Sequence, residues 1–222
     1  MTKGVLILGG SGFIGGKLYD YFKKKRINVK GTYCKNYGLM DKEDRIFLDL
    51  SKGTHVAIAS DEIKHIVLCH GISKIDECKK NKYTSYLINV ENTIKLLTRF
   101  EKIEVTPVYI SSDMVYDGKK KNPSELDVPK PNTEYGRQKL LVEEYIRKNF
   151  AQYIILRLTK TYGVEKGDKS IFTSWLDRLL AGEKIIGAYD SFISPVYIYD
   201  VIEAIAVLMN GGYHGVYNLG GK

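Results

Sequence analysis

The sequence predicts an α/β fold of the Rossmann type, in which helices cover both faces of one doubly wound parallel sheet. Short apolar runs alternate with longer helical patterns along the 222 residues, as expected for parallel strands joined by right-handed crossovers. The first run, 5–8, is apolar without interruption, which is typical of a strand buried on both faces. It leads directly into a glycine-rich turn that opens a helical pattern.

The other elements follow in order. We expect further strands at 29–33, 46–48, 66–69, 108–110, 153–158, 193–197 and 216–218. Apolar residues recur every three or four positions in 13–22 and 83–97, and this spacing predicts amphipathic helices. Further helices are expected at 134–148, 175–180 and 201–209. A proline-bearing loop, 123–131, precedes the first of these three helices, and no internal repeat is present.

The turn after the first strand contains glycines at positions 9, 12 and 15. In such a turn one glycine permits the tight bend, one lets the backbone approach a pyrophosphate, and one lets helix and strand pack closely. Free N–H groups at the helix start then face the phosphates. We therefore expect dinucleotide binding by the residues Gly9, Ser11, Gly12, Phe13, Ile14 and Gly15.

The choice of dinucleotide depends on the end of the second strand. An acidic residue there would hold the adenosine ribose and favour NAD, but the chain offers Tyr33-Cys34-Lys35. Lys35 could pair with a 2′-phosphate, so NADP(H) is preferred and NAD(H) is the alternative. Asp49-Leu50, after the third strand, either touches the adenine edge or, through Asp49, caps the following segment.

A tyrosine and a lysine, Tyr135 and Lys139, are four residues apart on a predicted helix and so project from one face. A nearby ammonium would favour the phenolate and lower the pKa of Tyr135 toward neutrality, as general acid catalysis requires. The alternative is an exposed pair without a function.

Polar residues near the ends of other elements complete this group. Ser111-Ser112-Asp113 follows the fifth strand, at the sheet edge where open α/β sheets bind ligands, and a hydroxyl there can bind a carbonyl oxygen. Asn89 lies inside the helix 83–97, where it is either part of the catalytic site or a structural hydrogen-bonding residue.

Motifs of one family span almost the whole chain in order: residues 9–15, 88–93, 111–118, 135–139 followed by Glu143-Glu144, 157–163 and 194–200. With these motifs the sequence resembles the extended short-chain dehydrogenase/reductases, which are NAD(P)-dependent enzymes of nucleotide-sugar metabolism. It is most similar to the dTDP-4-dehydrorhamnose reductase group, because the third motif ends in Tyr116-Asp117-Gly118.

The resemblance implies roles for individual residues. Tyr135 would donate a proton, Lys139 would be its partner and anchor the ribose, and Ser112 would orient the substrate carbonyl. Asn89 matches the helix asparagine of the family, and Pro195 with Val196 matches the segment beside the nicotinamide. We also expect cofactor contacts from His70, Gly71 and Ile110, and substrate contacts from Ser112, Asp113, Val115 and Tyr116.

The resemblance also implies a division of the chain. Residues 1–160 would form the NAD(P)-binding Rossmann domain with the catalytic residues, and 161–222 a small substrate lobe interleaved with the last strands and helices in a single compact unit. Family members usually continue for several dozen residues past the strand that matches 216–219. We therefore expect a smaller, more open pocket, or closure by another subunit, or an incomplete polypeptide.

These features predict an NAD(P)H-dependent reductase of a keto group on a nucleotide-linked sugar. One alternative is a nucleotide-sugar epimerase or dehydratase that holds NAD⁺ and regenerates it in each cycle. Another is a non-catalytic, NADP-binding regulatory subunit, because the superfamily contains such proteins. The helices 83–100 and 134–148 could pair in a homodimer.

Composition and charge narrow the class of protein. With 44% hydrophobic and 27% charged residues and no apolar run of about 20 residues, a membrane protein is not expected. The N-terminus leads straight into the fold without a cleavage site, and three scattered cysteines suggest neither a disulfide framework nor a metal site. These features favour the cytoplasm.

The net charge of +8 is concentrated in the runs 23–26 and 119–121. These runs are either solvated clusters or the source of a positive field that attracts a dinucleotide or nucleotide-sugar. We expect no nucleic-acid binding, because no module that combines aromatic and basic residues accompanies the charge.

Overall fold

The computed structural model describes residues 3–55, 62–168, 170–187 and 193–221. Its main sheet has seven strands, all parallel, in the order β3-β2-β1-β4-β5-β6-β9. The strands are β1 (Gly4–Leu8), β2 (Val29–Tyr33), β3 (Arg45–Phe47), β4 (Ile63–Leu68), β5 (Thr106–Ser112), β6 (Ile154–Leu158) and β9 (Gly215–Leu219). The predicted Rossmann-type α/β fold is confirmed.

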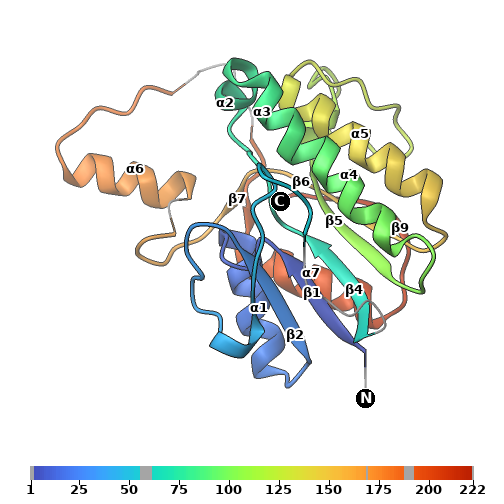
Figure 1. Ribbon diagram of the computed structural model, residues 1–222. Coiled ribbons are helices and arrows are strands. Elements are labelled where there is room, and N and C mark those ends of the chain that lie inside the picture. Colours follow the sequence, from blue (N-terminus) through green and yellow to red (C-terminus); the bar gives the residue numbers. More distant parts are fainter. Residues whose placement is uncertain (1–2, 56–61, 169, 188–192, 222) are drawn as a thin grey trace.

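Helices cover both faces of the sheet (Figure 1). Helices α1 (Phe13–Lys24) and α7 (Ile198–Asn210) pack on one face, and α4 (Asn92–Leu97) and α5 (Glu134–Asn149) pack on the other. Alternate strand residues supply the two cores: Val5 and Ile7 face the first pair of helices, whereas Leu6 and Leu8 face the second. Among the described residues, no helix combines the length and apolar character that a membrane span needs.

The helical stretch before β5 is more complex than the predicted helix 83–97. It consists of α2 (Ile75–Lys80), α3 (Lys82–Tyr86), a π-helical segment η3 (Leu87–Glu91), α4 and a final 3₁₀ turn, η4 (Thr98–Phe100). Helix α2 was not predicted, because four of its six residues are charged and it has no apolar period. The π segment places Asn89, Asn92 and Thr93 all inside the protein, and such segments are frequent at functional sites.

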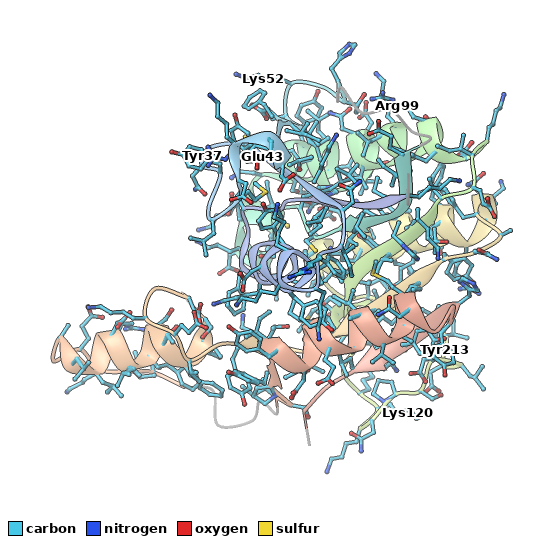
Figure 2. The ribbon with its side chains drawn as sticks, turned by 90° about the horizontal axis from the view of Figure 1, so that it is seen from below. Tyr37, Glu43, Lys52, Arg99, Lys120 and Tyr213 are labelled. Carbon is cyan, nitrogen blue, oxygen red and sulfur yellow. The ribbon has the colours of Figure 1, made fainter. Side chains whose placement is uncertain are left out.

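The residues between β6 and α7 form a second small sheet and a helix that stands away from the main body. Strands β7 (Thr161–Tyr162) and β8 (Val196–Tyr197) form a separate two-stranded sheet, so the strand predicted at 193–197 is reduced to its last two residues. Helix α6 (Ile171–Leu180) begins four residues before the prediction and stands away from the body (Figures 1 and 2). It has no buried residue, and its Phe172 ring contacts Tyr162 at a centroid distance of 4.9 Å.

The order of the strands fixes where a ligand can bind. From β1 the chain first builds β2 and β3 on one side and then returns to form β4 on the other. In open α/β sheets, ligands bind at the carboxyl ends of the strands where the order reverses. Gly9 follows β1 and His70 lies two residues beyond β4, and a Cβ on Gly9 would lie 2.9 Å from the His70 backbone nitrogen. The two segments therefore meet at this edge.

Two histidines at opposite edges of the sheet are held neutral. Burial, with the positive charge of Lys64, lowers the pKa of His65 to about 4. Burial, with the charge of Lys139, lowers the pKa of His70 to about 3. Because both values lie below the ordinary 6.5, the unfolded chain binds more protons than the folded one as the pH falls from about 6.5 to about 4.

We therefore expect the free energy of unfolding to fall below about pH 6.5, by up to about 1.4 kcal/mol per pH unit for each histidine. Urea denaturation between about pH 7.5 and 5 measures this slope. A His65→Gln variant should have a smaller slope, whereas His55→Gln, at an exposed position, should keep the wild-type slope. Equal slopes in the wild type and His65→Gln would contradict the expectation.

Candidate active site

The glycine turn has the geometry that a dinucleotide needs. Gly9 has a φ of +83°, and its N–H donates to Thr32 Oγ1 at 2.8 Å. A Cβ on Gly15 would lie 2.2 Å from the Gly9 carbonyl oxygen, so only glycine lets helix α1 approach the turn this closely. Gly12 caps α1 without a side-chain hydrogen bond. N–H groups at the start of α1 therefore remain available for phosphate oxygens.

His70 lies beside this turn and has a ring nitrogen without a partner. Its Nε2 is 2.7 Å from Thr93 Oγ1, whose own hydrogen is donated to the Ile88 carbonyl at 2.9 Å. Nε2 must therefore carry the proton that Thr93 accepts, which leaves Nδ1 as an acceptor. Nδ1 is buried and has no hydrogen-bond partner among the described residues. An orphaned polar atom beside a glycine cradle fits a site that a bound dinucleotide completes.

The segment after β2 lies against the glycine turn, since a Cβ on Gly38 would be 3.4 Å from the Ser11 Cα. Lys35 is exposed here. Nearby, the Arg45 guanidinium stacks 3.7 Å from the centroid of the Tyr37 ring, and Figure 2 shows Tyr37 at the surface. The Tyr37–Arg45 pair was not predicted, because nothing in the sequence links the two positions.

Asp49 and Leu50 follow β3. Asp49 Oδ1 accepts hydrogen bonds from the Ser51 N–H at 3.0 Å and from its hydroxyl at 2.6 Å, and these bonds lower the pKa of the carboxyl. These bonds close a turn after β3, and the contact of Asp49 with the adenine edge stays a prediction. The Leu50 side chain is buried in the same core cluster as residues of α4 and α5, and its contact with the cofactor stays a prediction.

The Tyr135–Lys139 pair lies in the first turns of α5. Thr133 caps this helix by accepting a hydrogen bond from the Gly136 N–H at 3.0 Å. Lys139 is buried, and its Nζ donates to the Ile110 carbonyl at 2.7 Å. The same nitrogen lies 5.7 Å from the Tyr135 ring centroid. Burial lowers the pKa of Lys139 to about 8, so the ammonium form still predominates at neutral pH.

The expected effect of Lys139 on Tyr135 is wrong. Burial raises the pKa of the Tyr135 phenol, and the nearby Cys78 and Asp113 raise it further. The physical reason is that the phenol is withdrawn from water while the Lys139 ammonium is directed to the Ile110 carbonyl. In this state the phenol keeps its proton, and a protonated phenol is what a proton donor requires.

Ser112 is the last residue of β5, which extends two residues beyond the predicted strand, and Asp113 begins a 3₁₀ turn, η5 (Asp113–Val115). Helix α5 touches this turn: a Cβ on Gly136 would lie 2.0 Å from the Met114 carbonyl oxygen. Only glycine permits this approach, which brings the neighbouring Tyr135 beside Asp113, whose charge acts on the phenol.

Val115 and Tyr116 were predicted to bind substrate. Val115 is fully buried, and its contact with the substrate stays a prediction. The Tyr116 hydroxyl donates to the Ser124 carbonyl at 3.0 Å or to Asn218 Oδ1 at 3.1 Å, and it accepts from Arg157 at 2.6 Å. Tyr116 therefore ties β6, β9 and the loop after η5 together.

The side-chain amide of Asn89 is fully used inside the protein. Its Oδ1 accepts from the Ile72 N–H at 2.8 Å, and its Nδ2 donates to the Ile72 carbonyl at 2.9 Å and to Gln138 Oε1 at 2.8 Å. Gln138 lies between Tyr135 and Lys139 on α5. Gly71 (φ +126°) makes room for this amide, since a Cβ there would lie 2.8 Å from Asn89 Oδ1. These hydrogen bonds connect Asn89 to α5, and a part for Asn89 in catalysis stays a prediction.

A buried ion pair links α5 to β6 next to the candidate site. The Arg157 Nη2 lies 2.6 Å from Glu143 Oε2, and the side chains are 2% and 0% exposed. Ser111, next to Ser112, donates to Glu143 Oε1 at 2.5 Å. Sequence reasoning did not predict this network or the role of Gln138. A signal existed for Arg157, because a lone charge inside the apolar run 154–158 needs a partner.

The last predicted segment is at the carboxyl end of β6. Thr159 Oγ1 donates to the Ser194 carbonyl at 2.5 Å, which holds Pro195 just before β8. The structure thus places the glycine turn, His70, Ser112 and Pro195 at the carboxyl ends of the strands, and Lys139 reaches the same region through Ile110.

Comparisons with known proteins agree with this arrangement. The profile of the RmlD substrate binding domain matches residues 2–222. The methionine adenosyltransferase 2 subunit beta of Rattus norvegicus is 28% identical over 184 residues, which are 82% of this chain and 54% of that protein. The chain thus spans about half the length of such curated relatives.

Two solved structures show the same fold. One is the dTDP-4-dehydrorhamnose reductase (rfbD) of Bacillus anthracis in complex with NADP, with a TM-score of 0.82 and 21% identity over 100% of this chain and 75% of that one. The other is MoeE5 in complex with UDP-glucose and NAD, with a TM-score of 0.83 and 23% identity over 98% and 76%.

Proposed function

Since this chain belongs to the RmlD substrate binding domain family, we propose that it is an NAD(P)H-dependent reductase, of the short-chain dehydrogenase/reductase type, that acts on a keto group of a nucleotide-linked sugar. The observation that carries the proposal is the meeting of three features at one sheet edge. These are the glycine cradle, the protonated Tyr135 phenol and the Ser112 hydroxyl.

Different residues at the carboxyl edge of the sheet would bind the cofactor, bind the substrate and transfer the proton. The glycine turn and the start of α1 would hold the pyrophosphate, and Lys139, already near Tyr135, would bind the ribose. NAD(P)H, when bound, supplies the hydride that reduces the ketone carbon. Ser112 binds the substrate oxygen, and Tyr135 transfers its phenolic proton to that oxygen. Solvent then restores the proton on Tyr135.

The test is the stoichiometry of cofactor consumption. With a panel of nucleotide-linked keto-sugars, including dTDP-4-dehydrorhamnose, we expect one NAD(P)H oxidised for each ketone reduced. Conversion of a nucleotide-sugar without net cofactor consumption would instead show an epimerase or dehydratase. MoeE5, whose structure holds UDP-glucose and NAD, gives a reason to include UDP-sugars in the panel.

A second candidate function is an NADP-binding regulatory subunit without catalysis. A relative named as a subunit of methionine adenosyltransferase favours it, whereas the hydroxyl, phenol and ammonium groups at the edge favour an enzyme. Cofactor binding without turnover on any keto-sugar, together with a stable complex with a different protein, would support this candidate.

We propose NADP(H) as the preferred cofactor, because Lys35 follows β2 where an acidic residue would select NAD. We expect Lys35→Asp to weaken NADPH binding about tenfold by loss of a charge-assisted contact to the 2′-phosphate. NADH binding should be unchanged or tighter. Dissociation constants from the fluorescence of the reduced cofactors measure both effects.

The control is Lys102→Asp, which makes the same charge change at an exposed residue just before β5, at the opposite edge of the sheet. It should leave the ratio of the two affinities unchanged. Loss of NADPH affinity in both variants would indicate a general charge effect and would remove Lys35 from the binding site.

A further inference from the structure

The hydroxyl hydrogen of Ser112 is already donated to a neighbouring side chain. Ser112 Oγ accepts a hydrogen bond from the Met114 N–H at 3.2 Å and donates its own hydrogen to Asp113 Oδ1 at 3.0 Å. A hydroxyl has one hydrogen and two lone pairs. Only one lone pair therefore remains for a ligand, and a lone pair can accept from an alcohol but cannot donate to a ketone oxygen.

Asp113 is the group that holds this hydrogen. It forms no ion pair with any described residue in the range of a salt bridge. Its charged surroundings are Lys160, beyond β6, which lowers the pKa of the carboxyl, and the Tyr135 phenol on α5, which faces it. Burial outweighs these effects and raises the pKa of Asp113 above its ordinary value. Protonation of this carboxyl is therefore easier than that of an exposed aspartate.

We propose that Asp113 is a positioning residue that sets the direction of the Ser112 hydrogen bond and thereby selects which redox form of the substrate the serine binds. When Asp113 is protonated, its O–H donates to Ser112 Oγ, and the serine hydrogen is free for the ketone oxygen. When Asp113 is ionised, it takes the serine hydrogen, and the serine accepts from the alcohol. This inference rests on the proposed reductase function.

The proton on Asp113 is not consumed in the reaction. The hydride goes to carbon and the Tyr135 proton to oxygen, as above, and solvent reprotonates Tyr135. Asp113 only changes the direction in which Ser112 donates. The predicted consequence is that ketone reduction is favoured while Asp113 is protonated, and alcohol oxidation is favoured once it is ionised.

The first experiment compares pH profiles of kcat/KM for the wild type and Asp113→Asn, with NADPH and dTDP-4-dehydrorhamnose and, in reverse, with NADP⁺ and dTDP-rhamnose. In the wild type we expect the reductive kcat/KM to fall about tenfold as the pH rises through the pKa of Asp113, because the ionised carboxylate takes the Ser112 hydrogen away from the ketone oxygen. Asparagine donates at every pH, so this step should vanish in Asp113→Asn, while oxidation should weaken. Identical profiles in the two proteins would overturn the proposal.

The second experiment needs no substrate. The ¹³C resonance of the Asp113 carboxyl, followed against pH, reports its pKa directly. Ser112→Ala removes the donor that stabilises the carboxylate and should raise that pKa, whereas Ser112→Thr keeps a hydroxyl and should leave it at the wild-type value. Equal values in the two variants would show that the hydroxyl does not serve Asp113, and the proposal would fail.

The two arms separate this inference from the function on which it rests. Turnover with equal Asp113 pKa values in the two serine variants would leave the reductase intact and overturn the role of Asp113. Absence of turnover on every keto-sugar would overturn both the reductase function and the selection of redox form by Asp113. A difference in the Asp113 pKa between the two serine variants would then show only that Ser112 and Asp113 share a hydrogen bond.

Discussion

A Tyr135→Phe variant should lose about 10²–10⁴-fold in kcat for ketone reduction, because it removes the proton donor and nothing else. The phenol is held in its protonated form by burial and by neighbouring negative charge, so it carries the proton that it would transfer to the substrate oxygen. The rate of NADPH oxidation at saturating keto-sugar measures the loss.

The NADPH dissociation constant should be nearly unchanged in this variant, because Lys139 and the glycine turn are intact. The matched control is Tyr145→Phe on the same helix, which removes a hydroxyl that contacts Glu101 far from the site. It should keep wild-type turnover. Full reductase activity in Tyr135→Phe would exclude this residue as the donor.

The second large effect concerns stability. We expect Glu143→Ala to lower the free energy of unfolding by about 3–5 kcal/mol, because Arg157 would remain buried without a counter-charge. The Ser111 hydroxyl would lose its acceptor as well. Urea denaturation at constant pH gives the difference, provided that the slope with urea is the same in both proteins.

Glu144→Ala is the control, since it removes an exposed carboxylate at the next position of the same helix. It should change stability by less than about 0.5 kcal/mol. A loss below about 1 kcal/mol in Glu143→Ala would mean that water or another group compensates Arg157.

The order of strands and helices could be predicted from sequence because each buried strand is a short apolar run between helical patterns. The glycine turn was predictable for a related reason: its three glycines sit directly between β1 and α1. Helix α2 was not predicted because its sequence is mostly charged. The predicted strand at 108–110 was shorter than β5 because the carboxyl end of β5, Ser111-Ser112, is polar. Polar residues in a fully buried strand carry no periodic signal.

The candidate site was predicted as a set of residues but not as a set of contacts. Asn89 and Gln138 are 49 positions apart, so only the folded chain shows that one amide binds the other. The direction of the Tyr135 pKa also depends on burial, which no local pattern reports. The burial of the Leu50 and Val115 side chains was unpredictable for the same reason.

The position of β1 inside the sheet, between β2 and β4, has a consequence for how the chain reaches its native state. β1 is the first strand to be synthesised, yet one of its two partners, β4, begins at Ile63, and β6 must wait for β9, which begins at Gly215. Each such pairing closes a long loop before any stabilising contact forms, which slows folding and leaves apolar strand edges open meanwhile. The strand order that brings the glycine turn and Ser112 to one edge thus commits a nascent chain to long-range pairing, and we expect it to be most prone to aggregation before β9 is in place.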